Sequence, residues 1–249
     1  MTPQAERLLF ENEACIVINK LPGESSEQPD LAAPGERFVV HRLDIPVSGC
    51  LLLAKTPEAA AFLCGAFASS ASCPHPAQVE KRYWAIVEKP KENNSFSKEG
   101  EVSRVLEHGI SFNKKENKSF AHDVKNETPQ KAPLKKQKST LKKAILRYRV
   151  IGQGEHYLFM EIDLVTGRHH QIRAQLAALG LHIKGDLKYG SRRSEENGGI
   201  RLHAHSLAFP NPQKPDEIIR VKAPPPVMDP LWTAFEKAAG ECMEACFSI

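Results

Sequence analysis

Asp44 is a strong candidate for chemistry in this sequence, because it closes the polar stretch of residues 41–44. A carboxylate in such a loop can act as a nucleophile or as a base that removes a proton. The alternative interpretation is a surface turn in which Asp44 pairs with Arg42, since ion pairs of this kind are common on protein surfaces. The partner of Asp44 in the folded chain therefore decides between the two interpretations.

Arg173 is a second candidate, because it lies close to the start of a predicted helix. Ile172, Leu176 and Leu179 recur at helical spacing and form an apolar stripe, so the helix begins near His169. Arg173 lies about 100° round the helix from Ile172 and therefore off this stripe. An arginine placed there can reach into a cleft beside the open amides of the helix N-terminus, which suit a phosphate or carboxylate group.

Histidines offer a different chemistry. His203 and His205 share one face of a predicted strand and can bind a metal ion together with His169, His170 or His182. No aspartate or glutamate stands at a matching spacing near the pair. A metal-dependent hydrolase that uses these histidines is therefore a remote alternative.

A buried strand and a capped helix must position the Asp44 loop. Residues 50–54 are apolar without a helical or alternating period, which is typical of a strand covered on both faces. Thr56, Pro57 and Glu58 supply a side-chain cap, a proline for the first turn and an acid facing the helix dipole. They predict a helix over residues 57–69 that anchors the loop from its far side.

Further strands follow from apolar alternation and turn residues. Residues 79–87 alternate, so Tyr83, Ala85 and Val87 share one face of their strand. Asp229 is expected to cap a final helix that begins at Pro230. The remaining predicted strands are residues 15–19, 101–106, 109–112, 141–151, 157–165 and 200–210.

Composition limits the class of protein. The 249 residues carry a net charge of +4, and residues 91–143 are lysine-rich, so a polyanionic partner is permitted. No apolar run approaches the ~20 residues that span a bilayer, and the first residues lack the pattern of a signal peptide. The six cysteines do not form a disulfide pattern, so we expect a cytoplasmic protein without a membrane segment.

Four separated blocks of the sequence resemble the RluA-like pseudouridine synthases. His-Arg-Leu-Asp at residues 41–44, with Ser-Gly and an aliphatic run at residues 48–54, resembles the signature of that family. The second block is the Lys-x-Tyr-x-Ala-x-Val strand at residues 81–87. The remaining blocks are Thr-Gly-Arg-His-His-Gln-Ile-Arg at residues 166–173 with the Gly-Asp-x-x-Tyr-Gly loop up to residue 190, and Leu-His-Ala at residues 202–204 with a proline-rich tail.

The resemblance implies an α+β fold: a central, mostly antiparallel, bent sheet flanked by helices and loops, with an active-site cleft across it. It implies isomerisation of a specific uridine to pseudouridine in structured RNA, with ribosomal RNA expected ahead of transfer RNA, and no cofactor or metal. Asp44 would be the catalytic aspartate, Arg173 its partner, and Tyr83 would stack on the target base. The residues expected to bind RNA are Arg42, Arg168, His170, Lys135, Lys136 and Lys138.

Val47, Leu146 and His169 stand where the family usually carries threonine or another hydroxyl residue. None of them replaces the expected catalytic residues, so activity should survive with an altered choice of target. The alternative is a relative that kept the fold but lost turnover and serves as an RNA-binding or ribosome-assembly protein.

The expected domain organisation is simple. One catalytic domain covers residues 1–235, with a mobile lysine-rich insertion at about residues 113–140. A C-terminal helix over residues 229–249 packs on this domain, and no separate N-terminal RNA-binding domain precedes it. We expect the protein to act as a monomer.

Overall fold

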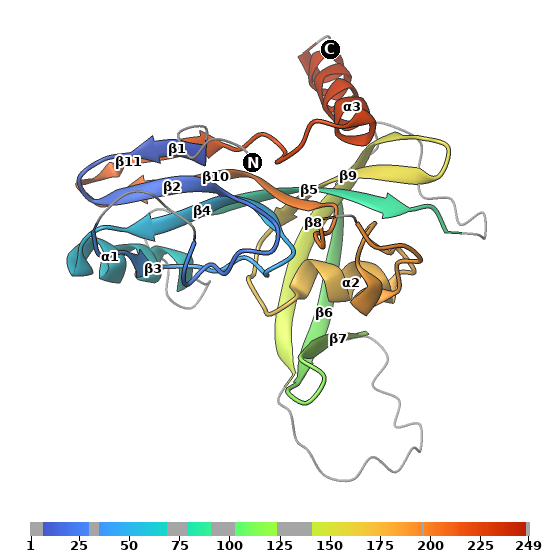
Figure 1. Ribbon diagram of the computed structural model, residues 1–249, viewed down its shortest axis with the longest axis horizontal. Helices are drawn as coiled ribbons and strands as arrows, with labels where there is room; N and C mark the ends of the chain where they lie inside the picture. Colours follow the sequence, from blue (N-terminus) through green and yellow to red (C-terminus); the bar gives the residue numbers. More distant parts are fainter. Residues whose placement is uncertain are drawn as a thin grey trace.

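The computed structural model describes residues 7–29, 35–68, 79–90, 103–123, 141–195 and 197–247, the last seven of these by their backbone alone. Its described part is built around one sheet of eleven strands (Figure 1). The strands are β1 (Leu8–Glu11), β2 (Cys15–Lys20), β3 (Phe38–Val39), β4 (Ser48–Ala54), β5 (Glu80–Glu88), β6 (Arg104–Asn113), β7 (Lys118–Asp123), β8 (Lys142–Gln153), β9 (Tyr157–Leu164), β10 (Leu202–Asn211) and β11 (Lys214–Lys222). The helices are α1 (Pro57–Ala68), α2 (Gln171–Ala178), α3 (Pro230–Phe247) and a short 3-10 helix, Leu187–Tyr189.

The sheet is mixed but largely antiparallel. Its strand order is β1-β2-β4-β10-β5-β9-β8-β6-β7, with β11 added to β10 and β3 added to β4. Only the β4–β10 pairing among these strands is parallel. The sheet bends where β6 and β8 turn away from the other strands, and α2 lies in the angle of this bend (Figure 1). The predicted α+β fold with a bent, mostly antiparallel sheet is confirmed.

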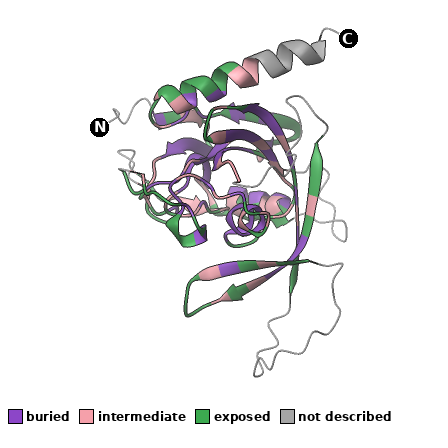
Figure 2. Cartoon of the chain, turned by 90° about the vertical axis from the view of Figure 1, so that its right-hand side faces the viewer, coloured by how far each residue is buried: buried purple, intermediate pink, exposed green. Residues whose placement is uncertain are grey.

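The two faces of β5 pack against different layers, as its alternation predicts. Tyr83, Ala85 and Val87 belong to the central core cluster, which also contains residues of β4, β8, β9 and α2. Trp84 and Ile86 point the other way and pack against α3. Buried residues therefore concentrate in the middle strands, whereas exposed residues follow α3 and parts of the β6–β7 hairpin (Figure 2).

The prediction of one long loop over residues 113–140 is wrong in part. Lys118–Asp123 forms β7, which pairs with β6 so that Phe112 lies opposite Ser119. The sequence of β7 is polar and lacks apolar alternation, so its strand conformation depends on this pairing. Residues 124–140, with Lys135, Lys136 and Lys138, lie outside the described residues.

Other boundaries differ for similar reasons. The two short strands predicted within residues 101–112 are one continuous strand, β6. The edge strands β1 and β11 were not apparent in the sequence, because they are short or mostly exposed. Helix α2 begins at Gln171, since His170 adopts a left-handed conformation with φ 52°. No helix in the described part is long and apolar enough to span a membrane.

Candidate active site

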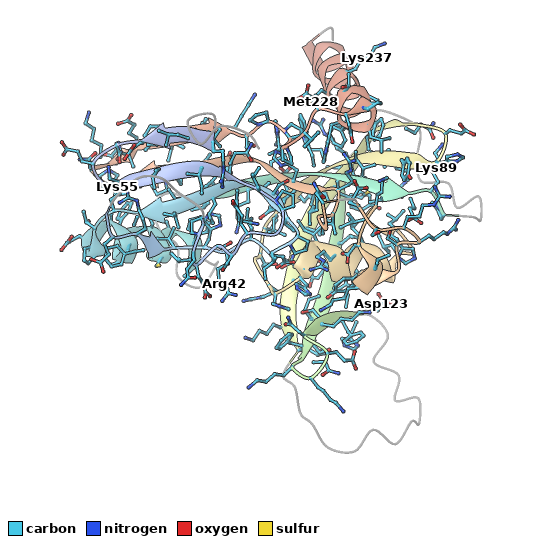
Figure 3. All side chains as sticks on the ribbon, in the orientation of Figure 1. Arg42, Lys55, Lys89, Asp123, Met228 and Lys237 are labelled. Atoms are coloured by element: carbon cyan, nitrogen blue, oxygen red, sulfur yellow. The ribbon has the colours of Figure 1, made fainter. Side chains whose placement is uncertain are left out.

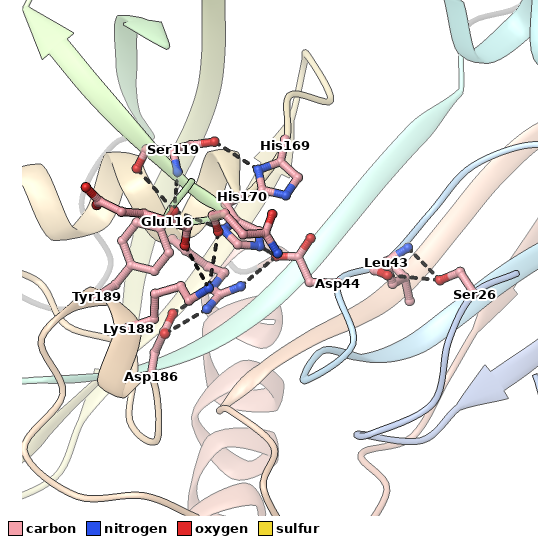
Figure 4. Close-up of polar contacts among 12 residues, drawn as sticks. Ser26, Leu43, Asp44, Glu116, Ser119, His169, His170, Asp186, Lys188 and Tyr189 are labelled. Carbon is pink, nitrogen blue, oxygen red and sulfur yellow. Dashed lines mark hydrogen bonds and ion pairs between the residues drawn. The ribbon is translucent and has the colours of Figure 1, made fainter. Parts of the chain in front are cut away.

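The loop that carries Asp44 is held by hydrogen bonds from both sides. The Ser26 hydroxyl accepts from the Leu43 amide at 3.0 Å and donates to the Leu43 carbonyl at 2.9 Å (Figure 4). The Val47 amide closes a turn on the Asp44 carbonyl at 3.0 Å. The buried ammonium of Lys20 donates to the Ile45 carbonyl at 3.2 Å. The backbone on either side of Asp44 is therefore fixed before any ligand binds.

Gly49 allows the strand after this loop to enter the sheet. It has φ +115°, and a Cβ atom at this position would lie 2.3 Å from the Ala204 carbonyl oxygen. Gly49 pairs with Ala204 in the parallel β4–β10 ladder. The neighbouring Ser48 hydroxyl contacts His203 Nδ1 at 2.9 Å. The Ser-Gly pair therefore serves a close approach of two backbones.

Arg173 joins two carboxyl groups. Its Nη1 donates to Asp44 Oδ2 at 3.0 Å, across 129 residues of sequence. Its Nε and Nη2 donate to the two oxygens of Asp186 at 2.7 and 2.8 Å. Arg173 and Asp186 are buried, whereas Asp44 keeps 24% of its side chain exposed. Asp186 therefore fixes the plane of the guanidinium, and Asp44 is the carboxyl group that a substrate can reach.

A second set of contacts reaches Asp44 through His170. His170 Nε2 lies 3.6 Å from Asp44 Oδ2, and its Nδ1 lies 3.0 Å from the Tyr189 hydroxyl. That hydroxyl accepts from the Ser119 amide at 2.9 Å and donates to the Ser119 carbonyl at 3.1 Å. The Arg173 guanidinium lies over the Tyr189 ring, 4.8 Å from its centroid. The β6–β7 hairpin is therefore connected to the site by specific hydrogen bonds (Figure 4).

Tyr83 lies within the same core cluster as Leu43, Val47 and Ile172, which flank Asp44 or Arg173 in the sequence. Burial and the negative charge of Asp44 raise the pKa of the Tyr83 hydroxyl. No hydrogen bond joins Tyr83 to Asp44 in the described part of the chain. The structure thus brings Asp44 and Arg173 into contact and places Tyr83 close to them.

Arg42 does not pair with Asp44. Its guanidinium contacts Glu27 at 2.9 Å, and both side chains are mostly exposed. Arg42 projects from the same side of the sheet that carries the β6–β7 hairpin (Figure 3). Arg168 is also exposed and donates to the Lys143 carbonyl at 3.1 Å, whereas His170 is buried. The geometry therefore differs from that of a surface turn with an Arg42–Asp44 pair.

His203 and His205 are engaged in the packing of β10. His203 contacts Ser48 through one ring nitrogen and the Ala223 carbonyl, at 3.0 Å, through the other. His205 reaches the same carbonyl at 3.1 Å and stacks on Trp84. Burial lowers the pKa of each histidine to about 4. Within the described ranges, no group of three or more His, Cys, Asp or Glu side chains is arranged to hold a metal ion.

The sequence identifies Asp186 and Tyr189 only as parts of a loop that matches the family pattern, and it assigns them no role. Gly185 has φ +91° and Gly190 has φ +102°, so the glycines of this loop allow its two tight turns. Asp186 lies between them and is almost completely buried. A buried aspartate needs a cationic partner, but the sequence does not show that the partner is Arg173.

The similarity to known proteins extends over most of the chain. Tested against models of protein families, residues 20–178 match the family described as RNA pseudouridylate synthase. The uncharacterized RNA pseudouridine synthase ZMO0505 of Zymomonas mobilis is 30% identical over 237 residues, which cover 89% of this chain and 94% of that protein. Ribosomal large subunit pseudouridine synthase D of the same organism is 28% identical, and the match covers 82% of this chain and 65% of that protein.

The chain is also similar to other proteins over nearly all of its length and in its three-dimensional structure. The tRNA pseudouridine synthase C of Vibrio parahaemolyticus is 25% identical, and the match covers 95% of this chain and 97% of that protein. The structure of human RNA pseudouridylate synthase domain containing 4 superimposes with a TM-score of 0.65 at 18% identity, covering 94% of this chain and 93% of that one. The family match and the identity to these relatives show that the chain belongs to the RNA pseudouridylate synthase family and is an isomerase that forms pseudouridine in RNA.

Proposed function

We propose that Asp44 is the catalytic carboxylate of this pseudouridine synthase and that Arg173 orients it. The observation that carries the proposal is the Arg173–Asp44 hydrogen bond, made by a guanidinium that is already fixed by Asp186. A charge-assisted bond of this geometry holds a carboxyl group in one orientation. The exposed part of Asp44 then faces the space from which a nucleotide can approach.

The reaction needs no net oxidation or reduction. The C1′–N1 bond of uridine breaks, a C1′–C5 bond forms, C5 loses a proton and N1 gains one. One carboxylate can start this sequence, either as a nucleophile at C1′ or as a base that removes a proton from the sugar. Tyr83 is proposed to stack on the uracil ring, which its position near Asp44 allows.

Ribosomal RNA is the proposed substrate class, and transfer RNA is the alternative. One relative is named for the large ribosomal subunit and another for tRNA. Arg42 and Arg168 are exposed cations on segments that also carry site residues, so we assign them to the RNA backbone. Arg42 stands two residues before Asp44, and its proposed role is to hold the phosphate of the extruded uridine or to fill the gap that this uridine leaves. The protein is proposed to act as a monomer in the cytoplasm.

Loss of the Asp44 carboxylate tests the proposal. Pseudouridine is mapped in ribosomal and transfer RNA from cells with and without the gene, and RNA from the deletion cells, tritiated at C5 of uridine, is then treated with purified protein. The wild type should release tritium, whereas Asp44→Asn should release none while still folding and binding RNA. Asp163→Asn is the matched control, because Asp163 pairs with Arg82 on the other face of the sheet.

Three results distinguish the alternatives. An active Asp44→Asn variant would refute the catalytic assignment. If deletion removes no pseudouridine and the wild-type protein releases no tritium, the inactive RNA-binding relative becomes the better explanation. If the missing sites lie in transfer RNA, the proposed substrate class is wrong and the catalytic assignment stands.

A further inference from the structure

His170 is an unusual residue for the first position before a helix. It adopts the left-handed conformation with φ 52° and ψ 26°, which is uncommon for residues other than glycine, although asparagine, aspartate and histidine adopt it more often than the rest. Its side chain is 8% exposed and directed toward Asp44. Strained backbone at such a position is typical of functional sites. The conformation places one ring nitrogen against Tyr189 and the other against the proposed catalytic carboxyl group.

The hydrogen bonds of Tyr189 determine which nitrogen of His170 carries the proton. A phenol has one proton to donate, and the Ser119 carbonyl, which can only accept, takes it at 3.1 Å. The contact of 3.0 Å between the Tyr189 hydroxyl and His170 Nδ1 is then satisfied only if Nδ1 is the donor. Burial lowers the pKa of His170 to about 3, so the ring is neutral. Nε2 therefore carries a lone pair.

This lone pair has no donor among its described neighbours. Asp44 Oδ2, at 3.6 Å, is itself an acceptor when ionised. The three side-chain hydrogen bonds that Arg173 donates go to Asp44 and Asp186. Nε2 is thus an oriented acceptor beside the reacting carboxyl group, and a substrate bound at Asp44 can supply the donor.

A uridine within an RNA chain offers two donors, the N3–H of the base and the 2′-hydroxyl of the ribose. N3 belongs to the base and is separated from the sugar by C2 and N1, whereas both chemical roles open to Asp44 act on the sugar at or next to C1′. The 2′-hydroxyl is attached to C2′ and is therefore the donor closest to Asp44. We propose that His170 Nε2 accepts a hydrogen bond from the 2′-hydroxyl of the target uridine and so selects ribose over deoxyribose. This inference rests on the proposed role of Asp44.

Two substitutions separate the two nitrogens of His170. His170→Asn keeps a donor at the position of Nδ1, removes Nε2 and suits the left-handed backbone. His170→Gln removes the donor to Tyr189 but can place an amide oxygen where Nε2 stood. Both proteins are compared with the wild type by thermal unfolding, so that a loss of fold is not mistaken for a loss of recognition.

The test is a double-mutant cycle in which residue 170 of the protein and the sugar of the target nucleotide are changed separately and together. The probes are stem-loop RNAs that contain the mapped uridine with a ribose, a 2′-deoxyribose or a 2′-O-methylribose at that nucleotide alone. Tritium release gives kcat/KM, and competition binding gives the relative Kd where turnover is slow. We expect the wild type to favour ribose about three- to tenfold, the range of one neutral hydrogen bond. In His170→Asn the ratio of kcat/KM for ribose to that for deoxyribose should be close to one, and His170→Gln should retain part of the preference for ribose.

The inference is overturned if His170→Asn prefers ribose over the two modified sugars as strongly as the wild type does. It is also overturned if the wild type shows the same kcat/KM and Kd for all three sugars. Failure of the catalytic proposal looks different, because an active Asp44→Asn variant would reveal it whatever the sugar preference.

Discussion

Asp186→Asn tests the idea that a buried carboxylate controls the catalytic geometry without touching the substrate. Asp186 takes two of the three side-chain hydrogen bonds of Arg173 at 2.7 and 2.8 Å and leaves only Nη1 for Asp44. Asparagine keeps the size of the side chain and one acceptor oxygen. Its amide group, however, turns a donor toward one of the Arg173 nitrogens, which are donors too.

The expected cost follows from these contacts. A hydrogen bond to a charged partner contributes about 1.5–3 kcal/mol, and Asp186→Asn loses one of two while weakening the other. A broken buried ion pair costs about 3–5 kcal/mol, but Arg173 keeps Asp44 as a partner at 3.0 Å. We therefore expect the free energy of unfolding to fall by about 2–3 kcal/mol. Without Asp186 the guanidinium can rotate to chelate Asp44, and a misplacement of about 1 Å should lower kcat/KM roughly 100-fold.

Urea unfolding measures the first effect and tritium release from C5-labelled RNA the second. Asp163→Asn serves again as control, because it removes an exposed ion pair with Arg82 that should contribute no more than about 1 kcal/mol. If Asp186→Asn unfolds within about 0.5 kcal/mol of the wild type and retains its kcat/KM, Asp186 does not orient Arg173, and the argument for a fixed site fails.

Three other predictions follow from single features. Gly49→Ala would place a methyl group 2.3 Å from the Ala204 carbonyl oxygen, so it should cost about 3 kcal/mol or more in denaturant unfolding; a cost below 1 kcal/mol would contradict the packing. Acid should destabilise the fold, because burial keeps the folded-state pKa of four histidines below the ordinary ~6.5. As the pH falls from 6.5 to 5.5, the unfolded chain binds more protons than the folded chain, so each of these histidines lowers the free energy of unfolding by roughly 1 kcal/mol. These are His41 and His170, with pKa values of about 3, and His203 and His205, with values of about 4. His203→Gln should flatten this pH dependence in thermal unfolding if the explanation holds. Arg42→Ala should leave stability unchanged and should reduce the slope of log Kd against log salt concentration for RNA binding by about one. An unchanged slope would show that Arg42 does not contact the RNA backbone.

Local patterns were sufficient for the elements whose burial is regular. The apolar run at residues 50–54 lies within β4, every residue of which is buried, and Pro57 begins α1 as predicted. The carboxylate of Asp229 accepts from the amides of Leu231 and Trp232 and caps α3. In each case the information is contained within a few neighbouring residues, which is why the sequence sufficed.

Elements defined by a distant partner were missed. β7 has a polar sequence and becomes a strand because it pairs with β6 and because the Ser119 backbone bonds to Tyr189, 70 residues further on. The pairing of Asp44 with Arg173 came from resemblance to a family, since no local pattern links positions 129 residues apart. The role of Asp186 was hidden for the same reason. Only the order of strands in the bent sheet brings these segments together.

The charge balance of the site explains why a neutral histidine belongs beside Asp44. One guanidinium faces two carboxyl groups, so the Asp44–Arg173–Asp186 group lacks one positive charge when both acids are ionised. A protonated His170 would supply that charge and form an ion pair with Asp44, which would compete with the substrate for the carboxylate. Burial, together with the nearby charge of Arg173, lowers the pKa of His170 and prevents this. The burial that makes the fold sensitive to acid therefore also leaves Asp44 available to react.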